Sequence, residues 1–232
     1  MKSKSIVILT GAGISAESGV RTFRDSNGLW ENHRIEDVAS PAGFVRNPKL
    51  VQRFYNARRA QLKTVQPNDA HKALARLERE WRGPFLLVTQ NVDDLHERAG
   101  SQNLVHMHGS LLSALCVDCE QASHWSDDLN ETSRCPNCKA SSKLRPDIVW
   151  FGEMPYHMEQ IGDALETADL LVSIGTSGVV YPAAGFAQQA HRASRYEINM
   201  TETEISHNFH IHRVGPASRE VPKLVNELLA EL

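Results

Sequence analysis

Short runs of consecutive apolar residues recur along the chain and predict the strands of a parallel sheet. Three such runs stand at Ile6–Leu9, Phe85–Thr89 and Asp169–Gly175, and Arg195–Asn199 follows as a fourth core strand that ends in polar groups. Continuous apolar runs of this length are typical of strands that are covered on both faces. A further short strand is expected at Leu104–Gly109.

Between these strands the apolar positions return with the period of a helix. Helices are expected at Leu50–Leu62, with Asn47 as N-cap and Pro48 in the first turn, and at His71–Glu80, Ile161–Ala168 and Pro222–Leu232. Residues 31–69 are expected to be helical and irregular, without strands. Buried strands that alternate with amphipathic helices indicate an α/β fold with a parallel sheet.

A glycine-rich turn follows the first strand directly. Gly11, Gly13 and Ala16 fit the G-x-G-x-x-G/A spacing, in which glycines let the backbone approach a pyrophosphate and a helix begins, here near Ile14. The pattern alone is weak, because such a turn without a ligand is common. A dinucleotide-binding fold would next need a strand that ends in an acidic residue about 20 positions on. The segment Arg21–Trp30 mixes arginines, aromatics and glycine without a period, which favours a loop that closes over a ligand.

Polar residues gather where the second apolar strand ends. Gln90, Asn91, Asp93 and Asp94 stand at the carboxyl end of that strand, where open α/β sheets place their ligands. An Asx-capped turn explains one of the two acids equally well and leaves the amides unexplained. In the next strand, His106 and His108 share one sheet face unless the strand kinks or ends between them.

All four cysteines of the chain stand in two C-x2-C pairs. Cys116 and Cys119 are separated by fifteen residues from Cys135 and Cys138, a spacing typical of zinc ribbons. Disulfides are the alternative, and a thioredoxin-like redox site would need a single C-x2-C pair. Four thiolates fill a tetrahedral coordination sphere, so the expected metal is one structural zinc ion.

Two further stretches carry candidate substrate contacts. Tyr55 and Arg58 lie three apart on the helix Leu50–Leu62, near the edge of its apolar stripe, where a core-margin tyrosine and a solvated arginine are the simpler interpretation. Leu144–Glu153 is extended in character, with an exposed Trp150-Phe151 pair that could add to a peptide as a strand. His207, His210 and His212 show no ligand pattern and are expected at the surface.

Composition narrows the class of protein. The 232 residues carry a formal net charge of −3 with 41% hydrophobic residues, which gives no general attraction to nucleic acids or anionic membranes. The first residues lack the apolar core and cleavage site of a signal peptide, and no apolar run reaches the length of a membrane span. A cytoplasmic protein without nucleic-acid or membrane partners is expected.

The motifs together resemble the sirtuins, a family of NAD-dependent protein lysine deacylases, from residue 5 to the C-terminus. The resemblance is carried, in family order, by Gly11–Gly19, Thr22–Arg24, Gln90–Asp93, His108-Gly109, the four cysteines, Phe151–Glu153 and Gly175–Ser177. The compact length and the Tyr55-x-x-Arg58 motif look most like the bacterial CobB-type members. The family departs from the usual dinucleotide pattern after the first turn, as this chain does.

The resemblance implies a Rossmann-like domain for NAD at about residues 1–31, 70–108 and 146–232. A small domain of a helical insertion plus the zinc ribbon would cover about 32–69 and 109–145, with acyl-lysine peptide in the cleft between the two. The acyl oxygen would attack the nicotinamide ribose to give an alkylimidate, and the products would be nicotinamide, O-acyl-ADP-ribose and free lysine. Acetyl and succinyl groups are the expected acyl groups, with malonyl as a further candidate.

The resemblance also implies the roles of individual residues. His108 would be the general base, and Asn91 and Asp93 would hold nicotinamide and its ribose, while Phe23 and Arg24 close the loop over them. The expected NAD contacts are Gly11, Ala12, Gly13, Ser15, Ala16, Glu17, Phe23, Arg24, Trp30, Gln90, Asn91, Val92, Asp93, Gly175, Thr176, Ser177, Asn199, Met200, Thr201 and Ala217. The expected substrate contacts are Tyr55, Arg58, Val149, Phe151, Gly152 and Glu153.

Two other functions stay open at this point. An NAD-dependent mono-ADP-ribosyltransferase would use the same ribose chemistry to modify a protein side chain. An NAD-sensing or zinc-ribbon interaction module would bind without turnover, although His108, Asn91 and Asp93 argue against it. The protein is expected to act as a monomer on acyl-lysine protein substrates.

Overall fold

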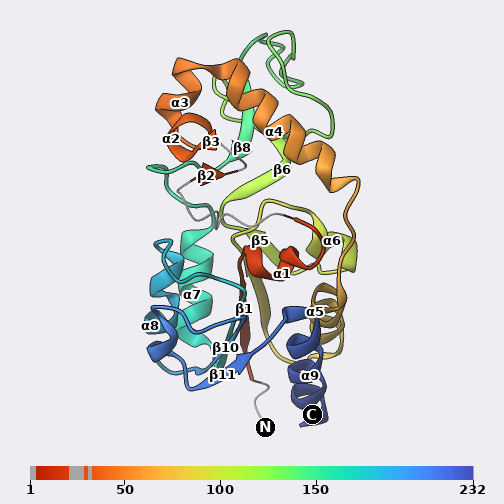
Figure 1. Ribbon diagram of the computed structural model, residues 1–232, viewed down its shortest axis with the longest axis vertical. Helices are drawn as coiled ribbons and strands as arrows, with labels where there is room; N and C mark the ends of the chain where they lie inside the picture. The colour runs from red at the N-terminus through yellow and green to blue at the C-terminus, as the bar shows by residue number, and fades with distance from the viewer. Residues whose placement is uncertain (1–3, 21–28, 31–32, 232) are drawn as a thin grey trace.

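A six-stranded parallel sheet forms the centre of the protein, seen here in a computed structural model that describes residues 4–20, 29–30 and 33–231 (Figure 1). Its strands are β1 (Ile6–Thr10), β4 (Phe85–Thr89), β5 (Leu104–His106), β9 (Leu170–Ile174), β10 (Ser194–Asn199) and β11 (Ile211–Val214). They run in the order β5-β4-β1-β9-β10-β11, and every pair is parallel. Numbered by appearance within this sheet, the order is 3-2-1-4-5-6, that of a doubly wound dinucleotide-binding fold.

The strand order shows where the second strand of the parallel sheet comes from, since no strand of this sheet directly follows β1 in the described part of the chain. The chain leaves the sheet after β1 and returns 75 residues later with β4, which pairs with β1 from Ile6 opposite Phe85 to Thr10 opposite Thr89. The order reverses direction at β1, whose neighbours are β4 on one side and β9 on the other. Ligands of open α/β sheets bind outside the carboxyl ends of the strands at such a point. The fold therefore brings residues after β1, β4 and β9 to one place.

Helices cover both faces of this sheet, as the continuous apolar strands predict. Ile6 and Ile8 of β1 face α5 (Asp69–Glu80) and α9 (Ala217–Ala230). Val7 and Leu9 face α7 (Met158–Thr167) and α8 (Phe186–Gln189) on the other side. Figure 1 shows these two helical layers left and right of the strands. The short elements α1 (Ala12–Ala16), α6 (Leu95–Ala99), η1 (Ala183–Gly185) and η2 (Ser206–Asn208) complete this part.

A second part sits beyond the carboxyl ends of the strands, at the top of Figure 1. It contains the helices α2 (Ile35–Val38), α3 (Pro41–Arg46) and α4 (Pro48–Leu62), the hairpin β2 (Leu29–Trp30) with β3 (His33–Arg34), and an antiparallel sheet β7-β6-β8 (Ala122–His124, Gly109–Cys116, Leu144–Ile148). It has its own apolar cores, one under α4 and one around the cysteines. Among the described helices, none combines the length and apolar character needed to cross a bilayer.

Several predicted boundaries were wrong. The first helix begins at Ala12 instead of near Ile14, and the last helix begins at Ala217, with Pro222 inside it. The strand at Leu104 ends at His106, so His106 and His108 do not share a sheet face. Residues 31–69 include the short strand β3, and the edge strand β11 was not predicted. In β11 the middle residues, His212 and Arg213, are polar, so the strand lacks an apolar run.

Candidate active site

A cavity of about 490 Å3 lies at the carboxyl ends of the parallel strands, between the two parts of the protein. A cavity of this size and mixed lining is typical of small-molecule sites. Its walls include these predicted site residues: Gly11, Ala12, Gly13, Ala16, Glu17, Trp30, Tyr55, Gln90, Asn91, Val92, Asp93, His108, Val149, Phe151, Gly152, Glu153, Gly175, Thr176, Ser177, Asn199, Met200 and Ala217. The fold thus brings together most of the residues singled out from the sequence.

Some predicted site residues lie elsewhere. Ser15 is buried beneath the cavity, and Thr201 borders a neighbouring small hollow. Arg58 is not among the described residues of the cavity wall. Phe23 and Arg24 fall outside the described residues.

Part of the wall consists of residues that were not among the predicted site residues. Val20, Ala39, Ile148, Trp150, Pro155, Val180, Tyr181, Ile198 and Gly215 line the cavity as well. Most are apolar residues in loops, for which sequence patterns give no signal.

Two glycine turns form the floor of the cavity by direct backbone contact. Gly13 N–H donates to the carbonyl of Gly175 over 2.8 Å. A Cβ added to Gly13 would lie 2.6 Å from Gly175 Cα, and Gly175 has φ +62°. Both positions therefore exclude other residues, and the open backbone is the kind that approaches a pyrophosphate closely. Helix α1 has only five residues, so the expected attraction for an anion rests on local N–H groups more than on a long helix dipole.

The turn after β4 is held by a side chain from the turn after β9 and by one from helix α1. Gln90 Nε2 donates to Thr176 Oγ1 over 3.1 Å, and Asn91 Nδ2 donates to Ser15 Oγ over 3.1 Å. Asp93 accepts the Leu95 N–H over 3.2 Å, so Asp93 supplies the Asx turn and still borders the cavity. Asp94 instead lies 3.5 Å from Arg98. The Asx turn expected from the sequence is therefore confirmed for Asp93, and its place on the cavity wall leaves the role of Asp93 in ligand binding as a prediction.

Burial sets the charge of Asp93. The side chain is almost fully buried, and this raises the pKa of Asp93 from 3.8 to about 6, although the Leu95 N–H and the Ser15 hydroxyl stabilise its charged form. A carboxyl group whose pKa lies near neutrality can gain or lose its proton when a charged ligand binds beside it.

His108 and His106 differ in role despite their closeness in sequence. His108 Nδ1–H donates to the carbonyl of Gln90 over 3.1 Å, which leaves the Nε2 lone pair to take a proton. Burial lowers the pKa of His108, so its imidazole is neutral at neutral pH. Burial alone would lower the pKa of His106, but Glu97, 2.6 Å from Nε2 of His106, the Asn91 carbonyl and the charge of Asp93 together raise this pKa above its usual value. His106 also donates to the Asn91 carbonyl over 2.9 Å and so supports the turn.

Two buried histidines lie beneath the cavity floor. The rings of His71 and His96 are 4.9 Å apart, and His71 Nε2 is 3.4 Å from Ser15 Oγ. Burial lowers the pKa of His71 to about 4 and that of His96 well below its usual value. Below pH 6.5 the unfolded chain binds protons here that the folded chain does not, so stability falls as the pH is lowered. Asp93 acts oppositely, because the folded chain binds its proton first between about pH 6 and 3.8.

Replacement of Asp93 by Asn should therefore steepen the loss of stability in acid. Between pH 7 and pH 4.5, proton binding by Asp93 adds about 2 kcal/mol to the free energy of unfolding and so offsets part of the loss caused by the two histidines. The size follows because one unit of pKa corresponds to about 1.4 kcal/mol. Urea unfolding at pH 7 and pH 4.5 measures the difference between the two free energies of unfolding. We expect this difference to be larger in Asp93→Asn than in the wild type and unchanged in the exposed control Asp163→Asn. Parallel pH curves for all three would contradict the proton binding assigned to Asp93.

Tyr55 lies inside the core instead of at its margin. Its side chain is fully buried, and its hydroxyl accepts the indole N–H of Trp150 over 3.0 Å. Burial raises the pKa of Tyr55 well above its usual value. Arg58 lies one turn further along α4, with its guanidinium carbon 4.5 Å from the Phe54 ring centroid. The charge of Arg58 is close enough to favour the ionised form of Tyr55.

The loop after β8 is held in place by an ion pair between Arg145 of β8 and Glu153 of the loop. Arg145 donates to both carboxylate oxygens of Glu153, over 2.6 and 2.8 Å, and holds its pKa below the usual value against the effect of burial. Glu153 is thereby committed to the loop and is a poor candidate for a direct peptide contact. Trp150, expected to be exposed, is 2% exposed, whereas Phe151 is half exposed. The Phe151 N–H donates to the carbonyl of Ala39 over 3.0 Å.

The far end of the cavity lies at β10 and the start of α9. Asn199 Nδ2 donates to the Thr176 carbonyl over 2.7 Å. The carboxylate of Glu17 accepts the backbone N–H of Ser218 over 3.1 Å and its hydroxyl, so Glu17 caps α9 while it borders the cavity. Met200 is 61% exposed at the rim.

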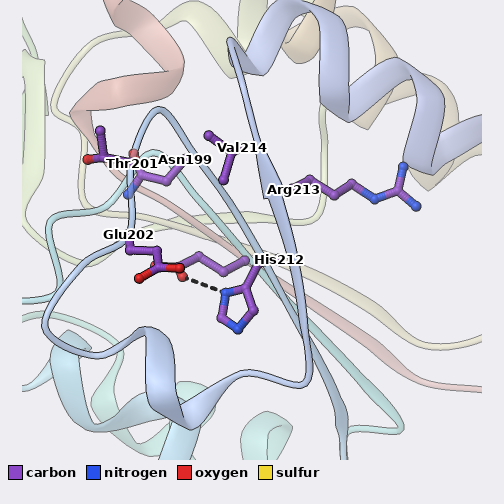
Figure 2. A pocket seen from close by; sticks show the side chains of 7 residues that line it. Asn199, Thr201, Glu202, His212, Arg213 and Val214 are labelled. Carbon is purple, nitrogen blue, oxygen red and sulfur yellow. Dashed lines mark hydrogen bonds and ion pairs between the residues drawn. The ribbon is translucent and has the colours of Figure 1, made fainter.

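A small hollow beside Asn199 contains Thr201, Glu202, His212 and Val214 (Figure 2). His212 Nδ1 lies 3.1 Å from the buried carboxylate of Glu197, the contact dashed in Figure 2, and Arg213 points away toward α9. His212 is therefore a partner of a buried acid. His210 contacts Arg195 over 2.8 Å, and all three histidines, His207, His210 and His212, are exposed as expected.

The four cysteines converge as their spacing predicts. Their Sγ atoms all lie within 4.8 Å of one another, with Cys116 and Cys138 3.7 Å apart and Cys119 and Cys135 also 3.7 Å apart. None forms a disulfide. Thiolates about 2.3 Å from a tetrahedral zinc ion are about 3.8 Å apart, so the residues fit such an ion.

Comparison with known proteins identifies the relatives of this chain. The sequence profile of the Sir2 family matches residues 11–182. The chain is 61% identical to an NAD-dependent protein deacylase of Bdellovibrio bacteriovorus over 97% of each chain. It is 57% identical to one of Vibrio parahaemolyticus over 98% of this chain and 96% of that protein.

Solved structures agree with the sequence relatives. A Sir2 homologue in complex with NAD is 39% identical, has a TM-score of 0.88, and is matched over 99% of this chain and 90% of its own. A Sir2 protein bound to acetylated peptide is 28% identical, has a TM-score of 0.82, and is matched over 97% and 93%.

Proposed function

The chain belongs to the Sir2 family, and on that premise we propose that it is an NAD-dependent protein lysine deacylase that removes acetyl and succinyl groups. The observation that carries the proposal is the single cavity wall shared by the glycine turns, the Gln90–Asp93 turn, His108 and Tyr55. Malonyl is a further candidate acyl group. A mono-ADP-ribosyltransferase is not favoured by the relatives, which are deacylases.

The residues present fit NAD as a co-substrate. Gly13 and Gly175 supply a cradle that any Cβ would fill, which suits the pyrophosphate, and Asn199 and Ala217 border the end suited to adenosine. Asn91 and Asp93 would hold the nicotinamide amide and ribose. Their side chains are kept in place by hydrogen bonds to the Ser15 hydroxyl and the Leu95 N–H, respectively. When bound, NAD supplies an electrophilic ribose carbon whose leaving group is nicotinamide.

His108 is proposed as the general base. Its Nδ1–H is occupied by the Gln90 carbonyl, so Nε2 is the nitrogen that can draw a proton from the ribose hydroxyls of the bound co-substrate. Its lowered pKa keeps Nε2 unprotonated at neutral pH. The proton would then leave through the same imidazole to water.

The acyl chain would enter beside Tyr55. The wall there is apolar, with Trp30, Ala39 and Trp150 beside the tyrosine, which suits the methylene groups of an acyl chain. A succinyl carboxylate would need a positive partner, and Arg58 is the cation one helical turn from Tyr55. Arg58 lies over Phe54, so contact with the carboxylate would require its side chain to swing from that ring.

The two parts of the protein are proposed to act as domains. The parallel-sheet part, about residues 1–31, 70–108 and 146–232, would bind NAD, and the part at about 32–69 and 109–145 would carry acyl recognition and a structural zinc ion. With four thiolate ligands the zinc would have no open position for substrate. Substrate peptide would lie against Phe151 and Gly152 between the two parts.

The products of the reaction test the proposal. The protein is incubated with NAD and peptides that carry acetyl- or succinyl-lysine, and the products are identified by mass spectrometry. O-acyl-ADP-ribose and free lysine support a deacylase. ADP-ribosylated protein would support the transferase, and unchanged NAD would indicate a binding module.

Replacement of Arg58 by Met should lower activity on succinyl-lysine much more than activity on acetyl-lysine. The variant keeps most of the side-chain volume and removes the charge, so kcat/KM for succinyl-lysine should fall by roughly 10- to 1000-fold, as loss of one buried charge partner costs about 2–4 kcal/mol. The value for acetyl-lysine should change far less. Steady-state assays on peptides that differ only in the acyl group measure both.

The matched control is Arg53→Met, an exposed arginine on the same helix. It should leave both substrates unaffected. Equal losses on both substrates in Arg58→Met would show that Arg58 supports the helix through Phe54 and does not read the acyl charge.

A further inference from the structure

A continuous chain of side-chain contacts runs from the cavity wall to the loop after β8. It consists of Tyr55, Trp150, Arg145 and Glu153. Tyr55 belongs to α4, and the other three belong to β8 and the loop that follows it. Trp150 is the member that touches all the others, whereas the sequence had suggested an exposed residue that could lie along a peptide.

The contact with Trp150 limits what the Tyr55 hydroxyl can do. The indole N–H can only donate, so over 3.0 Å it occupies a lone pair of the hydroxyl oxygen. The hydroxyl has a single hydrogen, which cannot point back along that bond. In the described part of the chain no acceptor for this hydrogen is seen, and Tyr55 borders the cavity, where a substrate group can supply one.

The indole is itself held on several sides. The guanidinium carbon of Arg145 lies 3.6 Å from the Trp150 ring centroid, a close cation–π contact. The backbone N–H of Trp150 donates to Glu153 over 2.8 Å, and Glu153 is bound in two places by Arg145. The Tyr55 and Trp150 rings also lie 6.5 Å apart at 35°. The donor that sets the hydroxyl therefore has a fixed position.

We propose that Trp150 is a positioning residue for acyl selection: its indole N–H orients the Tyr55 hydroxyl so that the hydroxyl hydrogen is presented to the carboxylate of a dicarboxylic acyl chain. The inference rests on the proposed deacylase function. An acetyl group ends in a methyl and offers no such acceptor at its tip. The selection of succinyl over acetyl should therefore depend on Trp150, and the dependence should act through Tyr55.

The alternative is that Trp150 acts only as a large core residue. It packs in the apolar core under α4 with Phe44, 5.2 Å away between ring centroids. Loss of core packing would lower activity on every substrate alike. Phenylalanine keeps an aromatic ring at this place and removes the N–H, so Trp150→Phe separates the two roles better than alanine would.

A double-mutant cycle with Tyr55→Phe tests the inference on the full chain. The measured quantity is kcat/KM for succinyl-lysine divided by that for acetyl-lysine, on one peptide sequence. Trp150→Phe should lower this ratio by about 5- to 20-fold, as expected for a hydrogen bond that orients a group bound to a charge. In the Tyr55→Phe background the same change should alter the ratio by less than about twofold.

The matched control is Trp81→Phe, which removes an indole N–H bonded over 2.9 Å to the Lys4 carbonyl, away from the cavity. It should leave the ratio unchanged. A calorimetric titration of the wild type and Trp150→Phe with succinyl-lysine peptide in the presence of ADP-ribose should show the same preferential weakening without turnover.

The possible results distinguish failure of the proposed deacylase function from failure of the role proposed for Trp150. Wild-type protein without NAD-dependent deacylation would overturn the proposed function. Normal deacetylation without desuccinylation, an unchanged ratio in Trp150→Phe, or an equal effect of Trp150→Phe with and without the Tyr55 hydroxyl would each overturn the inference and leave the deacylase intact.

Discussion

Replacement of His108 by Ala should lower kcat for deacylation by about 10²- to 10⁴-fold while NAD still binds. A positioned general base typically contributes a factor of this size. The ring is half-buried at the cavity wall and outside the main apolar cores, so its removal leaves little unfilled core volume. The Gln90 carbonyl loses its donor at the same time, and water in the enlarged cavity can replace it. Calorimetry with NAD and product assays measure the two properties separately.

An exposed histidine provides the control for this variant. His207→Ala should match the wild type in kcat, in NAD affinity and in melting temperature. If His108→Ala kept more than about a tenth of the wild-type kcat, another group would have to take the proton. A loss of NAD affinity equal to the loss of kcat would instead make His108 a binding residue.

Replacement of Cys135 by Ser should release the proposed zinc ion and lower the melting temperature by at least about 5 °C. A closed four-thiolate site loses a ligand that serine replaces poorly, and structural zinc binding contributes directly to folding. For a chain of this size, each kcal/mol of stability corresponds to about 2–4 °C. Metal analysis of the purified protein and calorimetric melting measure both effects.

The partner variant Cys138→Ser distinguishes metal binding from packing. Cys135 is fully buried in the core around the cysteines, whereas Cys138 is exposed. If the sulfur atoms hold a metal, both variants should lose zinc and similar stability. If Cys135 matters only as a buried side chain, Cys138→Ser should melt like the wild type. One zinc ion per chain with unchanged melting in Cys135→Ser would refute the structural role.

The parts of the site that follow strands could be predicted from the sequence. The carboxyl ends of parallel strands meet at one edge of the sheet, so polar residues after β1, β4 and β9 had to converge once the strands were recognised. The cysteine cluster was predictable for a different reason, since metal coordination depends on ligand spacing more than on the surrounding fold.

Contacts between the two parts of the protein could not be predicted in this way. The burial of Trp150 depends on how α4 packs against the loop after β8, and these segments are 95 residues apart in sequence at the Tyr55–Trp150 contact. The same holds for Glu153, which the sequence predicts as a substrate contact but whose carboxylate is bound by Arg145. Pairing across such distances leaves no periodic trace in a single sequence.

The contact between Gly13 and Gly175 has a consequence for anyone who wishes to redesign the enzyme. Side chains can be exchanged to enlarge or narrow most walls of a cavity, but this floor is made of main chain against main chain. Neither partner can gain a side chain to relieve a change in the other, so no compensating pair of substitutions exists. Altered co-substrate preference would therefore have to be engineered at the rim, around residues such as Met200, while the depth of the site stays fixed.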